Sequence, residues 1–249
     1  MRFGNEDSGI SIAMESGVAD VRLDRPAKLN SLTHDLMAAI RDTLDFLGSQ
    51  SDLRCVVLSG EGRSFCSGMD VSVLSGGEIA PLSPRTHGIA NGLQYCTWGW
   101  RELDVPVIAA IHGHCYGGGL QIAMGADVRI ATPEARLSIM EIRHGLVPDM
   151  GLFALARGLV RDDRLRELVY TAREFSGEDA AEFGLVTCTD AEPRKAALAL
   201  AAQIANSSAA AIAAAKRLIG QMQQSSAAEL LQFESDEQEA ILSATMARG

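Results

Sequence analysis

Two glycine-bearing segments could hold a reacting oxygen atom with their backbone. Residues 64–70 (SFCSGMD) follow the apolar run 55–58, and residues 116–120 (YGGGL) follow the apolar run 105–111. Glycine lacks a Cβ, so other groups approach its backbone closely, and free N–H groups at a helix start favour a negative oxygen. Two such donors, one from each segment, would form an oxyanion hole. Losing one donor of such a hole typically costs about 3–4 kcal/mol of transition-state stabilisation.

Neither segment is specific by itself, because a glycine run is more often part of a plain turn. The sequence contains no G-x-G-x-x-G motif and no G-K-[S/T] motif. It therefore does not support a dinucleotide site or a P-loop. The pairing of the two segments, each at the exit of an apolar strand, favours stabilisation of a carbonyl oxygen.

The elements that must position these segments follow from the periodicity of the apolar residues. Polar and apolar residues alternate over residues 19–23, which predicts a half-buried strand, and the runs 55–58 and 105–111 predict buried parallel strands. Leu36, Ile40, Leu44 and Leu47 recur at helical spacing. The other expected elements are helices over 88–102, 120–124, 196–205, 209–222 and 227–244, strands over 127–130 and 185–187, and a loop over 75–84.

Strands that alternate with helices predict an α/β fold with a mostly parallel sheet. We expect one continuous domain, with a core over residues 1–190 and a helical region over residues 191–249. Ser176 begins a capping-box-like S-x-x-D sequence, and Gly184 ends the short helix that follows. One face of the helix 209–222 is apolar, so the last helices form either a packed layer or an oligomer surface. This face consists of Ile212, Ala215, Ile219 and Met222.

The composition argues against several classes of function. The chain has 249 residues, 47% of them hydrophobic, and a net charge of −10, which is ordinary for a globular protein. Acidic residues interrupt the arginines between positions 157 and 173, so there is no basic stripe for a nucleic-acid partner. No stretch approaches the roughly 20 apolar residues that cross a bilayer, and the first 20 residues lack the apolar core of a signal peptide. We expect a cytoplasmic protein with no nucleic-acid or membrane partner.

The cysteines and histidines predict neither a disulfide framework nor a metal site. The five cysteines include no C-x-x-C pair, which fits a reducing compartment. Cys66 and Cys115 are interpreted as small core residues, since no partner base is identifiable. His112 and His114 lie outside any metal-binding motif and are interpreted as turn or interface residues.

Five segments, in order, resemble the enoyl-CoA hydratase/isomerase (crotonase) superfamily. They are RPAKLNSL (25–32), SFCSGMD (64–70), VPVIAAIHGHCYGGGLQIAMGAD (105–127), MEIRHGLVPDMG (140–151) and SGEDAAEFGLV (176–186). The resemblance implies a crotonase-like fold of repeated ββα units with a C-terminal helical layer, assembled as a homotrimer or a dimer of trimers. It implies an acyl-CoA thioester substrate and no cofactor, since CoA is part of the substrate.

Matched position by position, the resemblance assigns the oxyanion hole to the backbone N–H groups of Met69 and Gly118. It also implies that Lys216 reaches a CoA phosphate, which the matching lysine does across a subunit boundary in some relatives. The alternative is a solvated surface lysine. The residues implied to line the CoA path are Lys28, Leu29, Asn30, Met69, Asp70 and Val71.

The acid–base groups must decide the reaction. Hydratases of the family use two glutamates, and the position of the first is Gln121 here, whose amide orients a group but accepts no proton at neutral pH. The position of the second is Glu141. Asp149 matches an aspartate of some isomerases, including dienoyl-CoA isomerases, although those enzymes carry an acid where this chain has Gln121. The structural alternatives are that Glu141 pairs with Arg143 on the surface and that Asp149 caps the next helix.

Three hypotheses follow. The favoured one is a double-bond isomerase with Glu141, Asp149 or both as the base, because one carboxylate can both remove and return a proton. The second is a hydratase in which Gln121 holds the water that Glu141 activates. The third is a CoA-binding protein without catalysis. Leu152 and Phe153 stand where many relatives have Gly-Thr, which adds bulk near the expected acyl pocket.

Overall fold

The computed structural model describes residues 1–5, 7–75 and 81–246, so half of the expected loop 75–84, residues 76–80, lies outside the described residues. A seven-stranded sheet with the order β1-β2-β3-β4-β5-β7-β10 forms its centre. Pairing is antiparallel between the first three strands and parallel from β3 onward. The strands are β1 (Arg2–Gly4), β2 (Gly9–Glu15), β3 (Val18–Asp24), β4 (Cys55–Gly60), β5 (Val107–Ile111), β7 (Val128–Ala131) and β10 (Cys188–Thr189).

Alternating residues of the parallel strands bury themselves in two separate clusters, one on each face of the sheet. Val56 and Leu58 pack with α1 (His34–Gly48), α3 (Gly92–Glu102) and α4 (Gly118–Gly125). Cys55 and Val57 pack with Ala197 and Ala201 of α8 (Pro193–Ala205) on the other face. A strand buried on both faces reads as a continuous apolar run, which explains why β4 and β5 were predictable. The predicted mostly parallel sheet is confirmed.

A small second sheet, with the order β6-β8-β9, extends beyond the carboxyl ends of β4 and β5. The periodicity of the sequence did not predict it, because its strands have only two or three residues. These strands are β6 (His114–Tyr116), β8 (Arg136–Ser138) and β9 (Phe175–Ser176). Short helices complete the body: η1 (Pro26–Lys28), α2 (Val71–Ser75), η2 (Glu141–His144), α5 (Leu152–Leu155), α6 (Asp162–Thr171) and α7 (Gly177–Phe183).

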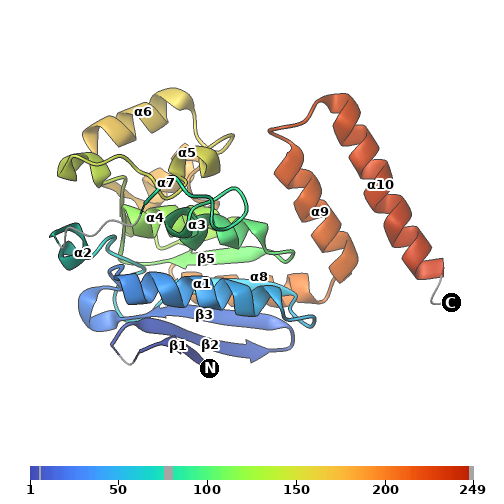
Figure 1. Ribbon diagram of the computed structural model, residues 1–249, viewed down its shortest axis with the longest axis horizontal. Helices are drawn as coiled ribbons and strands as arrows, with labels where there is room; N and C mark the ends of the chain where they lie inside the picture. Colours follow the sequence, from blue (N-terminus) through green and yellow to red (C-terminus); the bar gives the residue numbers. More distant parts are fainter. Residues whose placement is uncertain (6, 76–80, 247–249) are drawn as a thin grey trace.

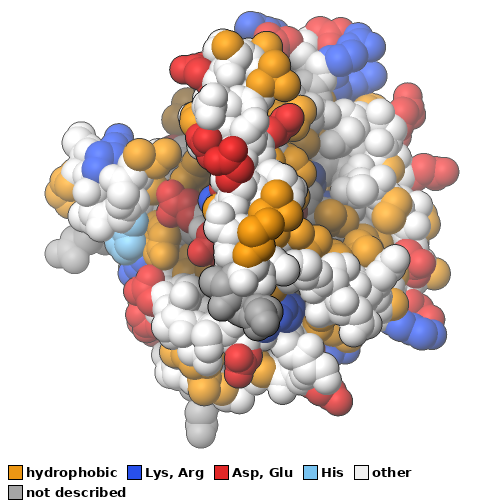
Figure 2. All heavy atoms as spheres, turned by 90° about the vertical axis from the view of Figure 1, so that its right-hand side faces the viewer, with side chains coloured by type: hydrophobic (Ala, Val, Ile, Leu, Met, Phe, Trp, Pro, Cys, Tyr) orange, Lys and Arg blue, Asp and Glu red, His pale blue; other side chains and the backbone are white. Residues whose placement is uncertain are grey.

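The last two helices, α9 (Ala209–Gln221) and α10 (Ala227–Met246), stand beside the body as a hairpin (Figure 1). Among the described residues, α9 buries only Ala214 and α10 buries none. On the predicted apolar face, Ile219 and Met222 are 62% and 60% exposed. Figure 2, which views this side, shows hydrophobic side chains spread over it. The hairpin is therefore an open apolar surface in the single chain.

Within the described residues, no single helix has the length and apolar character of a membrane span. Helices α8 and α9 satisfy that test only as a pair, and they are bent by 113° at their junction.

One local expectation was wrong, two strands were not predicted, and one local expectation was confirmed. The strand expected at 185–187 lies at β10 instead, because Val186 N–H donates to the Ala180 carbonyl and the Arg129 guanidinium binds the Leu185 carbonyl. The strands β1 and β2 were not predicted, although β2 alternates apolar and polar residues. The capping box at Ser176 is confirmed, with Asp179 as its partner.

Candidate active site

The two glycine-bearing segments lie side by side because they leave neighbouring parallel strands at the same edge of the sheet. Cys66 N–H donates to the His114 carbonyl at 3.0 Å, and Tyr116 N–H donates to the Cys66 carbonyl at 3.0 Å. Both cysteines are fully buried, and burial raises the pKa of the Cys66 thiol to about 12. The predicted structural role of the cysteines is therefore confirmed.

Glycine is required at this junction. Gly117 has φ 49° and ψ −121°, a conformation that L side chains rarely adopt, and an added Cβ there would lie 3.3 Å from Glu141 Oε1. A Cβ on Gly68 would lie 2.9 Å from the Tyr116 carbonyl oxygen and 3.9 Å from the Gly118 nitrogen. The two glycine-bearing segments thus lie so close to each other and to Glu141 that a Cβ at either glycine would crowd its neighbour.

The backbone N–H groups of Met69 and Gly118, which are predicted to form the oxyanion hole, bind no acceptor in the described part of the chain. The Leu32 carbonyl binds Asp70 N–H, and Leu32 N–H binds the Gly68 carbonyl, so Met69 N–H between them has no protein acceptor. Gly118 is the first residue of α4, where a helix N–H has no intrahelical partner. Both N–H groups are therefore available to one carbonyl oxygen.

Glu141 lies beside these donors with one oxygen free. Its Oε1 accepts a 2.7 Å hydrogen bond from Gln121 Nε2, whereas Oε2 is buried with no partner among the described residues. Burial raises the pKa of Glu141, and the charge of Asp149 raises it further, against a lowering by the Gln121 hydrogen bond. No surface pair with Arg143 forms within the described residues. An unpartnered buried carboxylate oxygen with a raised pKa has the properties of a general base.

Gln121 is 1% exposed and uses both ends of its amide. Its Oε1 accepts hydrogen bonds from Met150 N–H at 3.0 Å and Leu152 N–H at 3.1 Å. These two donors fix the amide orientation, so Nε2 must face Glu141.

Asp149 lies in the segment that Gln121 holds. Burial raises the pKa of its carboxylate, which makes no hydrogen bond to another described residue. The alternative that Asp149 caps the next helix is wrong, because Gly151 is the N-cap of α5 and no side chain caps it. The structure thus brings Glu141, Asp149, Gln121, Met69 and Gly118 together.

The residues expected along the CoA path form the adjoining wall, and several of them hold the backbone in shape. Lys28 is exposed, and Leu29 and Asn30 adopt positive φ values of 52° and 55°. The buried Asn30 amide donates to the carbonyls of residues 61, 64 and 65 and accepts from Arg25 N–H. Asp70 pairs with Arg25 at 2.7 Å, which holds the pKa of its carboxyl well below the usual range. Val71 begins α2 and is 75% exposed.

Lys216 lies at the other edge of the sheet. Its Nζ binds Asp127 Oδ2 at 3.0 Å and the Val105 carbonyl at 2.8 Å, before the amino end of β5. The five residues of β5 separate the two edges by about 17 Å, and Figure 1 shows α2 and α9 at opposite ends of the body. Its side chain is only 11% exposed, so it is not a solvated surface lysine, and it does not join the other predicted residues.

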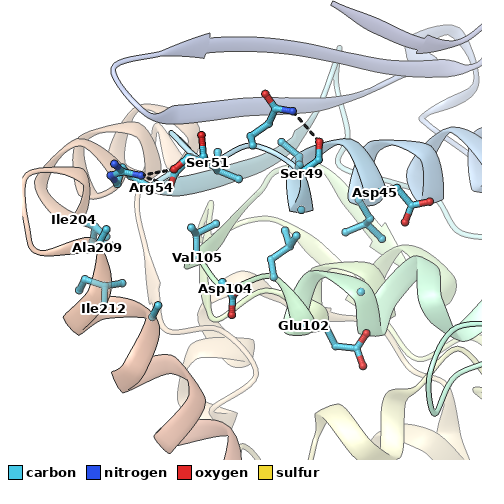
Figure 3. Close-up of a pocket in the computed structure, with 18 of the residues that line it drawn as sticks. Asp45, Ser49, Ser51, Arg54, Glu102, Asp104, Val105, Ile204, Ala209 and Ile212 are labelled. Atoms are coloured by element: carbon cyan, nitrogen blue, oxygen red, sulfur yellow. Dashed lines mark hydrogen bonds between the residues drawn. The ribbon is translucent and has the colours of Figure 1, made fainter. Parts of the chain in front are cut away.

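A groove of about 910 Å³ opens near Lys216, between the ends of α1 and α3 and the junction of α8 with α9 (Figure 3). Arg54, Glu102 and Asp104 lie around it, with Val105 and Ile212 on its walls. None of the predicted catalytic residues lines this groove.

One contributor to the site had no sequence signal. The single hydroxyl proton of Thr97, buried on α3, lies within hydrogen-bond reach of the carbonyls of Met150 and Gln94, and its contact with Met150 holds the Asp149 segment from the other side. A threonine on a helical face gives no indication of a distant loop partner, so only the fold reveals it.

The chain is similar in sequence to a family model and to several known proteins. The family model described as enoyl-CoA hydratase/isomerase matches residues 13–248. A peroxisomal Delta(3,5)-Delta(2,4)-dienoyl-CoA isomerase of Arabidopsis thaliana is 33% identical over 70% of this chain, and the match spans just under two thirds (65%) of that relative. The short-chain-enoyl-CoA hydratase of Clostridium acetobutylicum is 30% identical over 93% of this chain and 88% of its own.

Solved structures agree with this similarity. A Thermobifida fusca protein described as an enoyl-CoA hydratase and solved in complex with CoA is 32% identical, with a TM-score of 0.84 over 96% of this chain and 95% of its own. The crotonase-like fold predicted from the sequence is confirmed.

Proposed function

Because the chain belongs to the enoyl-CoA hydratase/isomerase family, we propose that it moves a carbon–carbon double bond in an acyl-CoA thioester. Met69 and Gly118 N–H groups hold the thioester carbonyl oxygen. Glu141 Oε2 removes a proton from the carbon next to the carbonyl, which makes an enolate that the two N–H dipoles stabilise. Glu141 or Asp149 then returns the proton further along the chain.

The observation that carries this proposal is the free Oε2 of Glu141 beside two free backbone donors. Leaving a buried carboxylate oxygen unpaired is unfavourable for the fold, so its presence supports a role in proton transfer. It also argues against the binding-only hypothesis, which needs no such group. CoA belongs to the substrate, and the proposed reaction needs no cofactor or metal.

The hydratase remains the second candidate, and the relative from Clostridium acetobutylicum carries that name. Syn addition of water normally engages two acid–base groups in this family. The Gln121 amide cannot be the second of these groups, because it accepts and releases no proton at neutral pH and its carbonyl oxygen already binds two N–H groups. The lack of a second acid–base group at this position favours the isomerase.

The test is a two-substrate assay. Purified protein is incubated with a trans-2-enoyl-CoA and, separately, with a 3-enoyl-CoA and a dienoyl-CoA, and products are read by mass and ultraviolet absorbance. We expect the double bond of the 3-enoyl or dienoyl substrate to move without a change of mass. Gain of one water by the 2-enoyl substrate alone would replace the isomerase with the hydratase, and silence on every substrate would leave the binding protein.

We also propose that the chain assembles as a homotrimer or a dimer of trimers. The exposed apolar residues of α9 and α10 support this, because such a surface is seldom left to water. Light scattering should give three or six times the 26.5 kDa chain mass, and Ile219→Asp should lower it. A monomer would contradict the proposal. A cytoplasmic location stays a prediction for cell fractionation.

A further inference from the structure

The amide of Gln121 binds Glu141 directly and also binds the backbone that follows Asp149. Nε2 donates to Glu141 Oε1, while Oε1 binds the N–H groups of Met150 and Leu152, on the segment that carries Asp149. All three hydrogen bonds lie between 2.7 and 3.1 Å, and the side chain is 1% exposed.

This arrangement makes the two oxygens of Glu141 unequal. Oε1 accepts the amide hydrogen bond, and the buried Oε2 has no partner among the residues that the structure describes. A carboxylate held through one oxygen cannot rotate freely, so the same lone pairs always face the site.

We propose that Gln121 is the positioning residue that makes Glu141 a one-sided base and keeps it ionised at this site. The inference rests on the proposed function for its catalytic meaning. Gln121 does not touch the reacting atoms. It acts through Glu141 directly and through the backbone on which Asp149 sits.

Charge explains why an amide, and not a carboxylate, keeps Glu141 ionised. A glutamate at position 121 would keep an acceptor for the two backbone N–H groups but would place a second carboxylate oxygen against Glu141 Oε1. Two carboxylates at that separation cannot both be ionised and must share a proton. The amide avoids this sharing, because it donates to Glu141 and favours its ionised form.

Three variants separate these roles. Gln121→Glu retains an acceptor for Met150 and Leu152 but replaces the amide N–H that faces Glu141 with a carboxyl that shares a proton with it, whereas Gln121→Met removes both the acceptor and the amide donor. Gln203→Glu, at an exposed position on α8, is the matched control because it adds the same charge far from Glu141.

The readout is the titration of Glu141 by NMR, in protein labelled with ¹³C at the glutamate side-chain carboxyl. The resonance is assigned by its loss in Glu141→Gln. We expect the pKa of Glu141 to rise by about one unit in Gln121→Met and by more in Gln121→Glu, with no change in Gln203→Glu. We expect Gln121→Glu to unfold nearer the wild-type temperature than Gln121→Met does.

Kinetics give the second readout. With the substrate that the wild type turns over, the acidic limb of the rate profile should move to higher pH with Gln121→Glu, and kcat should fall about 10–100-fold at neutral pH with little change in KM. An unchanged Glu141 titration in both Gln121 variants would overturn the inference. If the wild type turned over nothing, the proposed function would fail, but the NMR titration would still decide whether Gln121 positions Glu141.

Discussion

Glu141 and Lys216 are both charged side chains that lie mostly buried, yet the chain surrounds them in opposite ways. Lys216 finds an ion pair with Asp127 and two backbone carbonyls. Glu141 finds one amide donor, and its second oxygen has no partner among the described residues. A satisfied buried charge holds the fold together, whereas an unsatisfied one is available to a substrate.

The comparison concerns two edges of one sheet. Lys216 joins α9 to the amino ends of β5 and β7, where Asp127 Oδ2 also accepts Val107 N–H at 2.8 Å. Glu141 lies beyond the carboxyl ends of β4 and β5, where the glycine-bearing segments meet. Four predictions test whether the amino-end edge, with Lys216, serves stability and the carboxyl-end edge, with Glu141, serves catalysis.

The largest expected effect is on activity. Glu141→Gln should lower kcat about 10²–10⁴-fold, because an amide accepts no proton in the transition state, while circular dichroism stays unchanged. The exposed Glu134→Gln is the control and should keep full activity. If Glu141→Gln and Asp149→Asn both retain turnover, the division between the edges is wrong.

The second largest effect is on stability, at Asn30, a buried residue of the carboxyl-end edge whose side-chain amide is fully hydrogen-bonded. Asn30→Ala should lower the free energy of unfolding by about 3 kcal/mol, because it strips four backbone groups of their partner in a buried site. Urea denaturation measures it. A loss below about 1 kcal/mol would show that water replaces the amide.

Lys216→Met should cost about 2 kcal/mol, because Asp127 loses its nearest cation and keeps only the Val107 N–H and the more distant Arg101 guanidinium, at 4.0 Å. We expect KM for the acyl-CoA to stay unchanged. The double variant Lys216→Met/Asp127→Asn should recover part of that stability, since an asparagine oxygen still accepts Val107 N–H. A several-fold rise in KM, without loss of stability, would instead assign Lys216 to the CoA phosphate.

The smallest expected effect is a gain in thermal stability, in Glu141→Gln. Burial raises the pKa of Glu141 above its unfolded value of about 4.3, so the folded state binds this proton more tightly. The resulting stability is fully present below the unfolded pKa and is lost as the pH rises through the folded pKa. Glu141→Gln should therefore unfold at a slightly higher temperature than the wild type at pH 7, by about 2–4 °C for each kcal/mol. The difference should shrink in acid, and calorimetry at both pH values checks it.

Sequence patterns predicted the elements that are long or buried on both faces. The runs at β4 and β5 and the spacing of Leu36, Ile40, Leu44 and Leu47 each matched the element observed. The strands β6, β8 and β9 are too short for any periodicity, and they form because the chain beyond the main sheet pairs with distant segments. The strand expected at 185–187 was displaced because α7 and Arg129 bind its backbone.

The site divides in the same way. Gly117 and Gly118 were recognisable because only glycine suits such a backbone, and the order of the motifs identified the family. The ion pair between Lys216 and Asp127 could not be predicted from the sequence, since the two residues lie 89 positions apart and either could have faced water.

The sequence alone determined the class of chemistry, because residue type decides what can accept a proton and where a backbone can turn without a Cβ. Tertiary structure alone decided which polar atoms are left without a partner. Which end of the Gln121 amide faces Glu141 depends on two N–H groups about 30 residues away along the chain. Hydrogen bonds of a buried group are allotted among whatever neighbours the fold supplies, and those neighbours exist only once the chain has packed.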